Sequence, residues 1–443
     1  MNKKNGKLKR NLGLVEGMAY VIGFVIGTGI FLKPAVVLTN MGSAGSALAI
    51  WVIGGLISMC GALTISEIAA YIPKIGGLYT YLVELYGDVV GFLYGWVQCI
   101  ISSPGGSAAM AIAFATFATY FVPLGNWGVK LLAIFTLLLI VVLQIISTKL
   151  SMQMQTVATI GKLVPMAAII IFGLYKGTVG DISFMTDGIT KGAGTGVALL
   201  GVLWAYDGWM QTCTLGDEMV NPEKNLPKSI ILGLSFVIVV YALFNIAIFN
   251  VLPVSAVAAS KNIGVDVSIK LFGSVGTTFI TIGMLLSSFA ALNAQLAGGV
   301  RIAFAMGQRK QLPKYRVLSH VNPKLDTPIN SILFQTIIAI IFILLGTFNT
   351  ITDLCIFTIW IFFTFGILGI FVLRKKYPRN NKLYKVPLYP IIPILGVLGG
   401  CYLIFMTIKD SFISSLLGIG LTLIGLPIFY YCKNKYSKEE IIE

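Results

Sequence analysis

Two stretches decide how this chain folds: Ile26-Gly27-Thr28-Gly29-Ile30-Phe31, inside the first long apolar segment, and Trp204-Ala205-Tyr206-Asp207-Gly208-Trp209, inside the sixth. Glycine is the least favourable residue in a helix interior after proline. An aspartate inside an apolar run adds a charge that a buried helix rarely carries without a partner. Each stretch therefore predicts a long helix that is broken near its middle.

The composition places these breaks in a membrane protein. Of the 443 residues, 57% are hydrophobic and 11% are charged, whereas soluble domains carry about 25% charged residues. The 48 glycines and 16 prolines are spread through apolar sequence, which membrane helices tolerate. The six cysteines form no CxxC pair, so we interpret them as small packing residues, in neither a disulfide nor a metal site.

Apolar runs of about 20 residues, the length that crosses ~30 Å of hydrocarbon, recur along the whole chain. Twelve are expected as transmembrane helices, at 13–38, 43–71, 88–122, 126–146, 152–175, 195–216, 229–252, 269–306, 330–347, 351–373, 388–408 and 411–432. The predicted fold class is an all-α membrane protein with 12 transmembrane helices.

The net charge of +15 has a topological explanation, because cytoplasmic loops of membrane proteins collect Lys and Arg. With the N-terminus in the cytoplasm, 24 of the 32 basic residues fall in inner segments, seven fall in outer ones, and Lys162 lies in mid-membrane. This distribution favours an even number of spans in the plasma membrane, with both termini cytoplasmic, and argues against nucleic-acid binding. The first apolar segment is too long for a signal-peptide core.

Five spans separate the two broken helices, and five also separate the two longest spans, the third and the eighth. Because five is odd, the second set enters the membrane from the opposite face, as in inverted-repeat transporters that bind substrate at broken helices. We expect a 5+5 inverted repeat plus two C-terminal helices. The expected boundaries are 1–12 for an N-terminal arm, 13–175 and 176–373 for the repeats, 374–432 for the additional helices and 433–443 for a tail.

The breaks offer backbone groups that suit an amino acid. At Gly27-Thr28-Gly29 the freed N–H groups begin the outer half-helix, whose positive dipole end favours a carboxylate. Near Trp204 and Ala205, freed carbonyl groups can accept hydrogen bonds from an α-ammonium group. The alternative is that the glycines serve close helix packing alone, which two breaks in repeat-related places disfavour.

Several motifs resemble the amino acid–polyamine–organocation (APC) superfamily, and within it the L-type amino-acid transporters, including their bacterial serine/threonine exchangers. The resemblance covers essentially the whole chain. It rests on the stretches Ile26–Phe31, Gly76–Tyr81, Trp204–Trp209, Glu218–Lys224 and Arg309–Pro313. It implies a twelve-helix fold with five-plus-five inverted repeats and sodium-independent exchange of L-amino acids.

The resemblance also implies roles for residues of both breaks. The backbone at Thr28, Gly29 and Ile30 holds the substrate carboxylate, and the segment from Trp204 to Asp207 surrounds the amino group, with Trp204 as an aromatic gate. Relatives that accept cystine and basic amino acids carry Asp at the position of Asp207, but so do the serine/threonine exchangers, so Asp207 does not by itself imply basic substrates. The expected substrate-binding residues are Ile26, Gly27, Thr28, Gly29, Ile30, Trp204, Ala205, Tyr206, Asp207 and Gly208.

Lys162 sits midway along the fifth predicted span, where a charge costs at least about 2.5–3.5 kcal/mol. As the resemblance suggests, its ammonium is expected to replace a sodium ion and link the fifth span to the broken first helix. The alternative is a structural ion pair with Asp207 or Glu67. For Asp207 itself, contact with the substrate side chain and hydrogen bonding to unwound backbone both stay open.

Other polar residues near the spans allow two interpretations each. Glu16 and Glu67 are expected as solvated interface residues, with an inner-gate salt bridge as the alternative. Lys33 either lines the outer vestibule or extends outward to water. Asn293 and Gln295 are expected to join helices rather than line the pathway.

The function expected is sodium-independent antiport of small neutral L-amino acids such as Ser, Thr, Ala and Cys, by alternating access. The alternative is a proton-coupled importer of neutral or cationic amino acids or polyamines. An enzyme is disfavoured because nucleophiles, metal ligands and paired carboxylates do not cluster, and no cofactor is expected. A channel would need a continuous polar pore, and a sensor on this fold stays open. The partners expected are small L-amino acids and the lipid bilayer, with no covalent partner subunit, because the outer loop 123–127 lacks cysteine.

Overall fold

A computed structural model of the chain describes residues 13–72, 76–146, 163–178, 194–212, 219–322, 327–378, 380 and 383–436, with the backbone alone at 211–212 and 222–223. All named elements in this part are helical. In the first half of the chain they are α1 (Leu14–Val25), α2 (Gly29–Leu32), α3 (Pro34–Met41), α4 (Ala44–Tyr71), α5 (Gly77–Tyr86), α6 (Asp88–Val97), the π-helix η1 (Gln98–Ser102), α7 (Ser103–Ala118), α8 (Asn126–Ile146) and α10 (Thr195–Tyr206).

The second half continues the helical architecture. Its elements are α11 (Trp209–Thr212), α12 (Pro222–Val251), α13 (Val254–Ala259), α14 (Ile263–Gln308), α15 (Tyr315–Leu318), α16 (Ile329–Leu345), α17 (Phe348–Lys376), α18 (Ile391–Asp410), α19 (Phe412–Leu423) and α20 (Gly425–Tyr436). Within the described ranges, nine spans are long and apolar enough to cross a membrane, and three further apolar helices are shorter: Leu163–Lys176, Thr195–Tyr206 and Ile329–Leu345. The described part of the chain is therefore all-helical, and its long apolar helices indicate a multi-pass membrane protein.

Both predicted breaks are present. The second break begins several residues after the start of its sequence motif. The first helix stops at Val25 and resumes at Gly29. Lys33 between α2 and α3 keeps helical angles, so the outer half-helix is nearly continuous from Gly29 to Met41. In the sixth span, α10 runs on through Trp204 and Ala205 to Tyr206, and the backbone breaks at Asp207 and Gly208. The Trp204 carbonyl is used at this helix end, where it accepts a hydrogen bond from the Asp207 N–H at 3.2 Å.

The long third and eighth spans are both irregular inside. The third runs through α6, η1 and α7 as one stretch, Asp88–Ala118. The eighth, α14, contains a kink at Gly273, whose φ is 64°. The predicted start of this span at 269 thus lies close to the kink, with a separate helical piece before it. α14 packs along α7, while α12 packs along α4 and α1.

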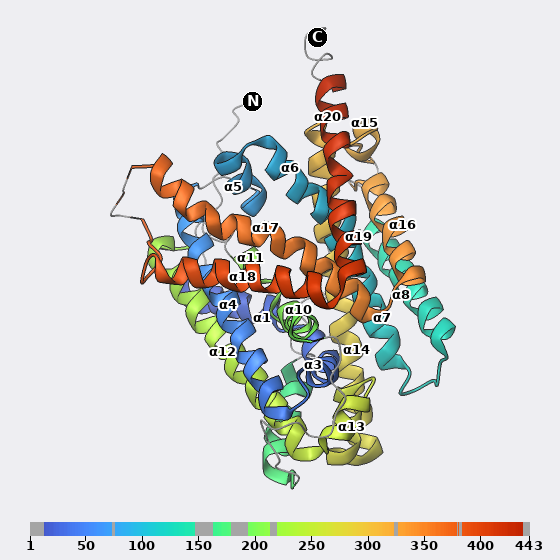
Figure 1. Cartoon of the computed structure of the whole chain (residues 1–443). Helices are drawn as coiled ribbons and strands as arrows, with labels where there is room; N and C mark the ends of the chain where they lie inside the picture. The colour runs from blue at the N-terminus through green and yellow to red at the C-terminus, as the bar shows by residue number, and fades with distance from the viewer. Residues whose placement is uncertain are drawn as a thin grey trace.

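The short connecting helices lie at opposite ends of the bundle. α5, which joins the second and third predicted spans, lies at the same end as α15 and α20 in Figure 1. α13, which joins the seventh and eighth, lies at the other end (Figure 1). The two ends of the bundle are therefore marked by different short helices, α5 at one end and α13 at the other.

Neighbouring helices hold the start of α10 in place. The Asp410 carboxylate at the end of α18 accepts a hydrogen bond from the Gly196 N–H at 2.9 Å, and the Asn40 side chain of α3 accepts one from the Gly194 N–H at 3.2 Å. Because the first N–H groups of a helix lack intrahelical acceptors and carry a positive dipole end, a carboxylate is a favourable partner there. These contacts fix the distance of the sixth span from α3 and α18.

Polar side chains join helices in the membrane interior, as expected of Asn293. It accepts hydrogen bonds from Gln144 of α8 at both its backbone and side-chain oxygens, each at 2.9 Å. Gln295 lies against Gly106 of α7. Glu16 is exposed and accepts a hydrogen bond from the Gly13 N–H at 3.0 Å, so it caps α1.

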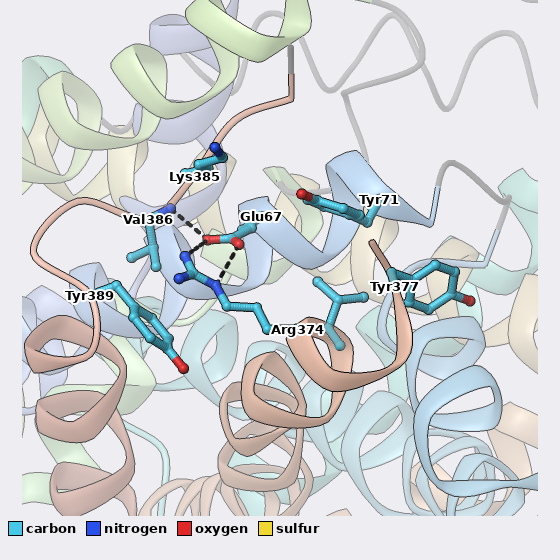
Figure 2. A pocket seen from close by; sticks show the side chains of 8 residues that line it. Glu67, Tyr71, Arg374, Tyr377, Lys385, Val386 and Tyr389 are labelled. Atoms are coloured by element: carbon cyan, nitrogen blue, oxygen red, sulfur yellow. Dashed lines mark hydrogen bonds and ion pairs between the residues drawn. The ribbon is translucent and has the colours of Figure 1, made fainter. Parts of the chain in front are cut away.

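Glu67 is not a solvated interface residue. It is 1% exposed, and its carboxylate pairs with both Nε and Nη2 of Arg374 in α17, at 2.9 and 2.8 Å. The same carboxylate accepts the Val386 N–H at 2.7 Å. Figure 2 shows this arrangement beside a cavity of about 460 Å³, with Tyr389 stacked on the Arg374 guanidinium. The salt-bridge alternative is the one that forms, and it ties α4 and α17 to the segment before α18.

We expect Arg374→Gln to destabilise the folded protein. Breaking a buried ion pair by removing one partner costs about 3–5 kcal/mol, and the 31% exposure of the Arg374 side chain places this loss at or below the lower end. Thermal unfolding in detergent measures it. A Glu67→Leu/Arg374→Leu double variant should recover part of the loss, since no uncompensated charge remains, while the Val386 N–H loses its acceptor. A melting temperature for Arg374→Gln equal to that of the parent would contradict the assignment.

Candidate functional site

The backbones of the two broken spans cross in close contact. A Cβ atom on Gly29 would lie 2.9 Å from the Ala205 Cα and 3.1 Å from the Trp204 ring. A Cβ on Gly208, whose φ of 116° already favours glycine, would lie 2.8 Å from the Phe24 carbonyl oxygen. The start of the outer half-helix therefore faces the end of α10, and the second break faces the end of α1.

Tyr241 of α12 connects the two breaks. Its hydroxyl lies 3.1 Å from the Val25 carbonyl oxygen and 2.9 Å from the Ala205 carbonyl oxygen, so its proton is shared between the last turns of α1 and α10. The side chain is fully buried and packs on Tyr206 and Trp51. Sequence analysis missed this residue, although a tyrosine at the centre of an apolar span, rather than in an interfacial belt, is the signal that identifies it.

Trp204 lies against Gly29 at this crossing and is only part-buried. Its ring meets Phe348, the first residue of α17, edge to face at 6.3 Å between centroids. Phe348 also lies under the ammonium of Lys33, which is 5.4 Å from the ring centroid. The predicted gate residue thus contacts both the broken first helix and the tenth span.

The side chains at the breaks are directed toward the third and tenth spans. The Thr28 hydroxyl contacts the Met110 sulfur at 3.3 Å. Asp207 is part-buried and lies within electrostatic range of Tyr94 in α6 and Cys355 in α17. The crossing thus brings together helix-end backbone, one carboxylate and apolar side chains, a combination that suits a small zwitterion.

The structure brings the predicted residues of both motifs together. Ile26 and Thr28 are buried beside Ile30, and Ala205 and Tyr206 are buried opposite them. Lys162 lies outside the described residues, so its predicted role stays a prediction. Lys33 neither lines an open vestibule nor reaches water: its side chain is 0% exposed and pairs with Asp353 of α17 at 3.0 Å.

Comparison with known proteins decides the family. A family model described as amino acid permease matches residues 12–426. The chain belongs to the amino acid permease family. This confirms the resemblance to the APC superfamily, and the family consists of transporters, not enzymes.

Curated relatives match over nearly the whole chain. The serine/threonine exchanger SteT of Bacillus subtilis is 38% identical over 436 residues, which cover 98% of this chain and 99% of that protein. The mouse b(0,+)-type amino acid transporter 1 is 32% identical, over 97% of this chain and 88% of its own. The human large neutral amino acids transporter small subunit 2 is 30% identical, over 96% and 80%. Family membership and these relatives together support amino-acid transport by this chain.

Gly29→Ala should reduce amino-acid uptake into vesicles at least about tenfold, because the added methyl forces apart backbones that only a glycine lets approach. The matched control is Gly23→Ala on α1, where a Cβ meets nothing within 4 Å. It should transport like the parent. Equal losses in the two variants, or none in Gly29→Ala, would show that the contact between the breaks is dispensable.

Proposed function

We propose that this protein is a sodium-independent antiporter that exchanges small neutral L-amino acids, such as Ser, Thr, Ala and Cys, across the plasma membrane. The observation that supports this proposal most directly is the crossing of two broken helices, where the start of the Gly29–Met41 half-helix faces the end of α10. Opposite helix ends at one point suit the opposite charges of one amino acid. The similarity to the serine/threonine exchanger supports both the substrate class and the exchange mode.

We assign the roles at the site accordingly. Backbone N–H groups of Thr28, Gly29 and Ile30 hold the carboxylate, and the segment from Trp204 to Asp207 surrounds the ammonium group. Trp204, with Phe348 at its edge, closes over the substrate. Tyr241 holds the two breaks at the spacing that the zwitterion requires.

A twelve-span, five-plus-five inverted repeat with two additional helices accounts for the architecture. The nine long spans and three shorter apolar helices in the described ranges fall on the twelve predicted runs. The order α4, α5, α6 to α7 in the first half has a counterpart in α12, α13, α14 in the second. That α5 and α13 lie at opposite ends (Figure 1) supports opposite orientations of the two halves.

The sequence supports the proposed orientation and the proposed absence of a covalent partner. The concentration of Lys and Arg in the segments assigned to the inner side supports cytoplasmic termini. The chain is proposed to function without a covalently attached subunit, because the loop 123–127 has no cysteine.

Exchange is tested by uptake of radiolabelled L-serine into proteoliposomes in sodium-free buffer without a pH gradient. Vesicles preloaded with unlabelled L-serine should take up label at least about tenfold faster than empty ones, because the loaded carrier returns more readily than the empty carrier. A response to an imposed proton gradient, with no stimulation by preloading, would instead assign a proton-coupled importer. The titratable Asp207 at the break is the feature that favours this second candidate.

Lys162→Ala should strongly slow exchange while leaving the protein folded, if the Lys162 ammonium replaces a sodium ion. The measurement is counterflow in the same vesicles, with size-exclusion behaviour in detergent as the folding check. Lys176→Ala is the matched control, because that lysine lies at the outer end of the same predicted span. Unchanged exchange in Lys162→Ala would contradict the sodium-replacing role.

A further inference from the structure

The cavity beside the Glu67–Arg374 ion pair has no part in the proposed exchange of amino acids. It measures about 460 Å³ and lies between the end of α4, the end of α17 and the segment that leads into α18 (Figure 2). Two cationic side chains, Arg374 and Lys385, line it together with three tyrosines, one of which, Tyr389, stacks on the Arg374 guanidinium at 3.5 Å. Cations in a cavity of this size suit an anionic group of a small molecule or a lipid.

The charges of the cavity do not cancel. Among the described residues that line it, Glu67 is the only acidic one. Its carboxylate is 2% exposed and already accepts hydrogen bonds from two Arg374 nitrogens and from the Val386 N–H. The Arg374 side chain is 31% exposed, and within the described part of the chain its third nitrogen, Nη1, donates no hydrogen bond. Because Glu67 balances one of the two cations, the cavity keeps one positive charge and an open edge of the guanidinium group.

The cavity lies at the basic end of a membrane-spanning helix. The last turn of α17 contains Arg374, Lys375 and Lys376, and the sequence from 374 to 385 holds six basic residues and no acidic one. Basic side chains at the end of such a helix reach the level of the lipid headgroups, and basic clusters directly on its cytoplasmic side attract anionic lipids. In the proposed orientation this end of α17 faces the cytoplasm. The surrounding charge therefore concentrates anionic lipid at the cavity.

An exposed apolar stripe leads away from the cavity along α18. It begins next to Tyr389 of the lining and follows one face of the helix, because its members are three or four residues apart. Their exposed fractions lie between 45% and 70%, and they are Leu388, Ile391, Leu395, Leu398, Tyr402 and Phe405. In a bilayer such a face contacts acyl chains. The cations and the stripe together match a molecule with an anionic head and an apolar tail.

We propose that this cavity binds the phosphate-bearing headgroup of an anionic phospholipid from the cytoplasmic leaflet. The phosphate lies between the Nη1 edge of Arg374 and the ammonium group of Lys385, since guanidinium groups bind phosphate oxygens strongly, and the acyl chains lie along the α18 stripe. A headgroup in this position contacts α17 and the segment before α18 at once. It therefore reinforces the connection that Glu67 makes among α4, α17 and that segment, and its binding requires no amino-acid substrate.

The first test is native mass spectrometry of the delipidated protein in detergent, titrated with phosphatidylglycerol. Lys385→Gln should lower the affinity for the first bound lipid about fivefold, because that is what one basic residue contributes to the binding of an anionic lipid. Lys375→Gln is the matched control: Lys375 is exposed in the last turn of the same helix and is not among the described residues that line the cavity. It should bind the lipid like the parent. Equal losses in the two variants, or none in Lys385→Gln, would overturn the proposal.

The second test uses the parent protein alone and separates a lipid from a free phosphate. Saturating phosphatidylglycerol should raise the melting temperature of the delipidated protein by at least about 2 °C, because a ligand that binds only the folded state stabilises it. Phosphatidylcholine with the same acyl chains has no net charge and should stabilise less, and glycerol phosphate, which lacks the chains, should not stabilise. Equal stabilisation by phosphatidylcholine would refute recognition of the anionic headgroup. Equal stabilisation by glycerol phosphate would assign the cavity to a soluble phosphate and overturn the proposal. Neither test involves serine, so a failure of exchange would leave both readable.

Discussion

A helix broken at membrane depth leaves backbone groups that water does not reach, and the rest of this structure depends on how those groups are satisfied. Here some of the backbone carbonyl groups at the two breaks find hydrogen-bond donors close to where the breaks meet. The Val25 and Ala205 carbonyl oxygens share the Tyr241 hydroxyl, and the Trp204 carbonyl takes the Asp207 N–H. The same constraint therefore shapes the fold and the place where the two breaks meet.

The surrounding helices keep this crossing at a fixed geometry. Asp410 and Asn40 hold the start of α10, and Gly208 and Gly29 allow contact distances that no other residue permits. At the proposed site a ligand would meet backbone whose positions are already determined, so little ordering cost would oppose its binding. The same rigidity means that movement must occur where whole helices separate, rather than within the breaks themselves.

Sequence predicted the features that depend on local composition. The apolar runs, the glycine-marked breaks and the long third and eighth spans could all be identified, because hydropathy and helix propensity act over a few residues. It placed the second break within Trp204–Trp209 but started it too early, because α10 continues through the first three residues of that motif. It also missed Tyr241 and misjudged Glu67 and Lys33. Their partners lie up to about 320 residues away in the chain, and composition near a charged residue does not reveal which distant helix neutralises it.

The two ion pairs on α17 differ in a way that bears on their roles. The Glu67 carboxylate is bound by two guanidinium nitrogens and by the Val386 N–H, so separating it from Arg374 also releases the segment before α18. Lys33 has a hydroxyl, one carboxylate oxygen and an aromatic face as partners, all on one helix. A single displacement of α17 from α3 therefore frees Lys33 completely, whereas the pair at the other end resists because three groups from three segments must part together. The tenth span is consequently held more firmly at Arg374 than at Asp353.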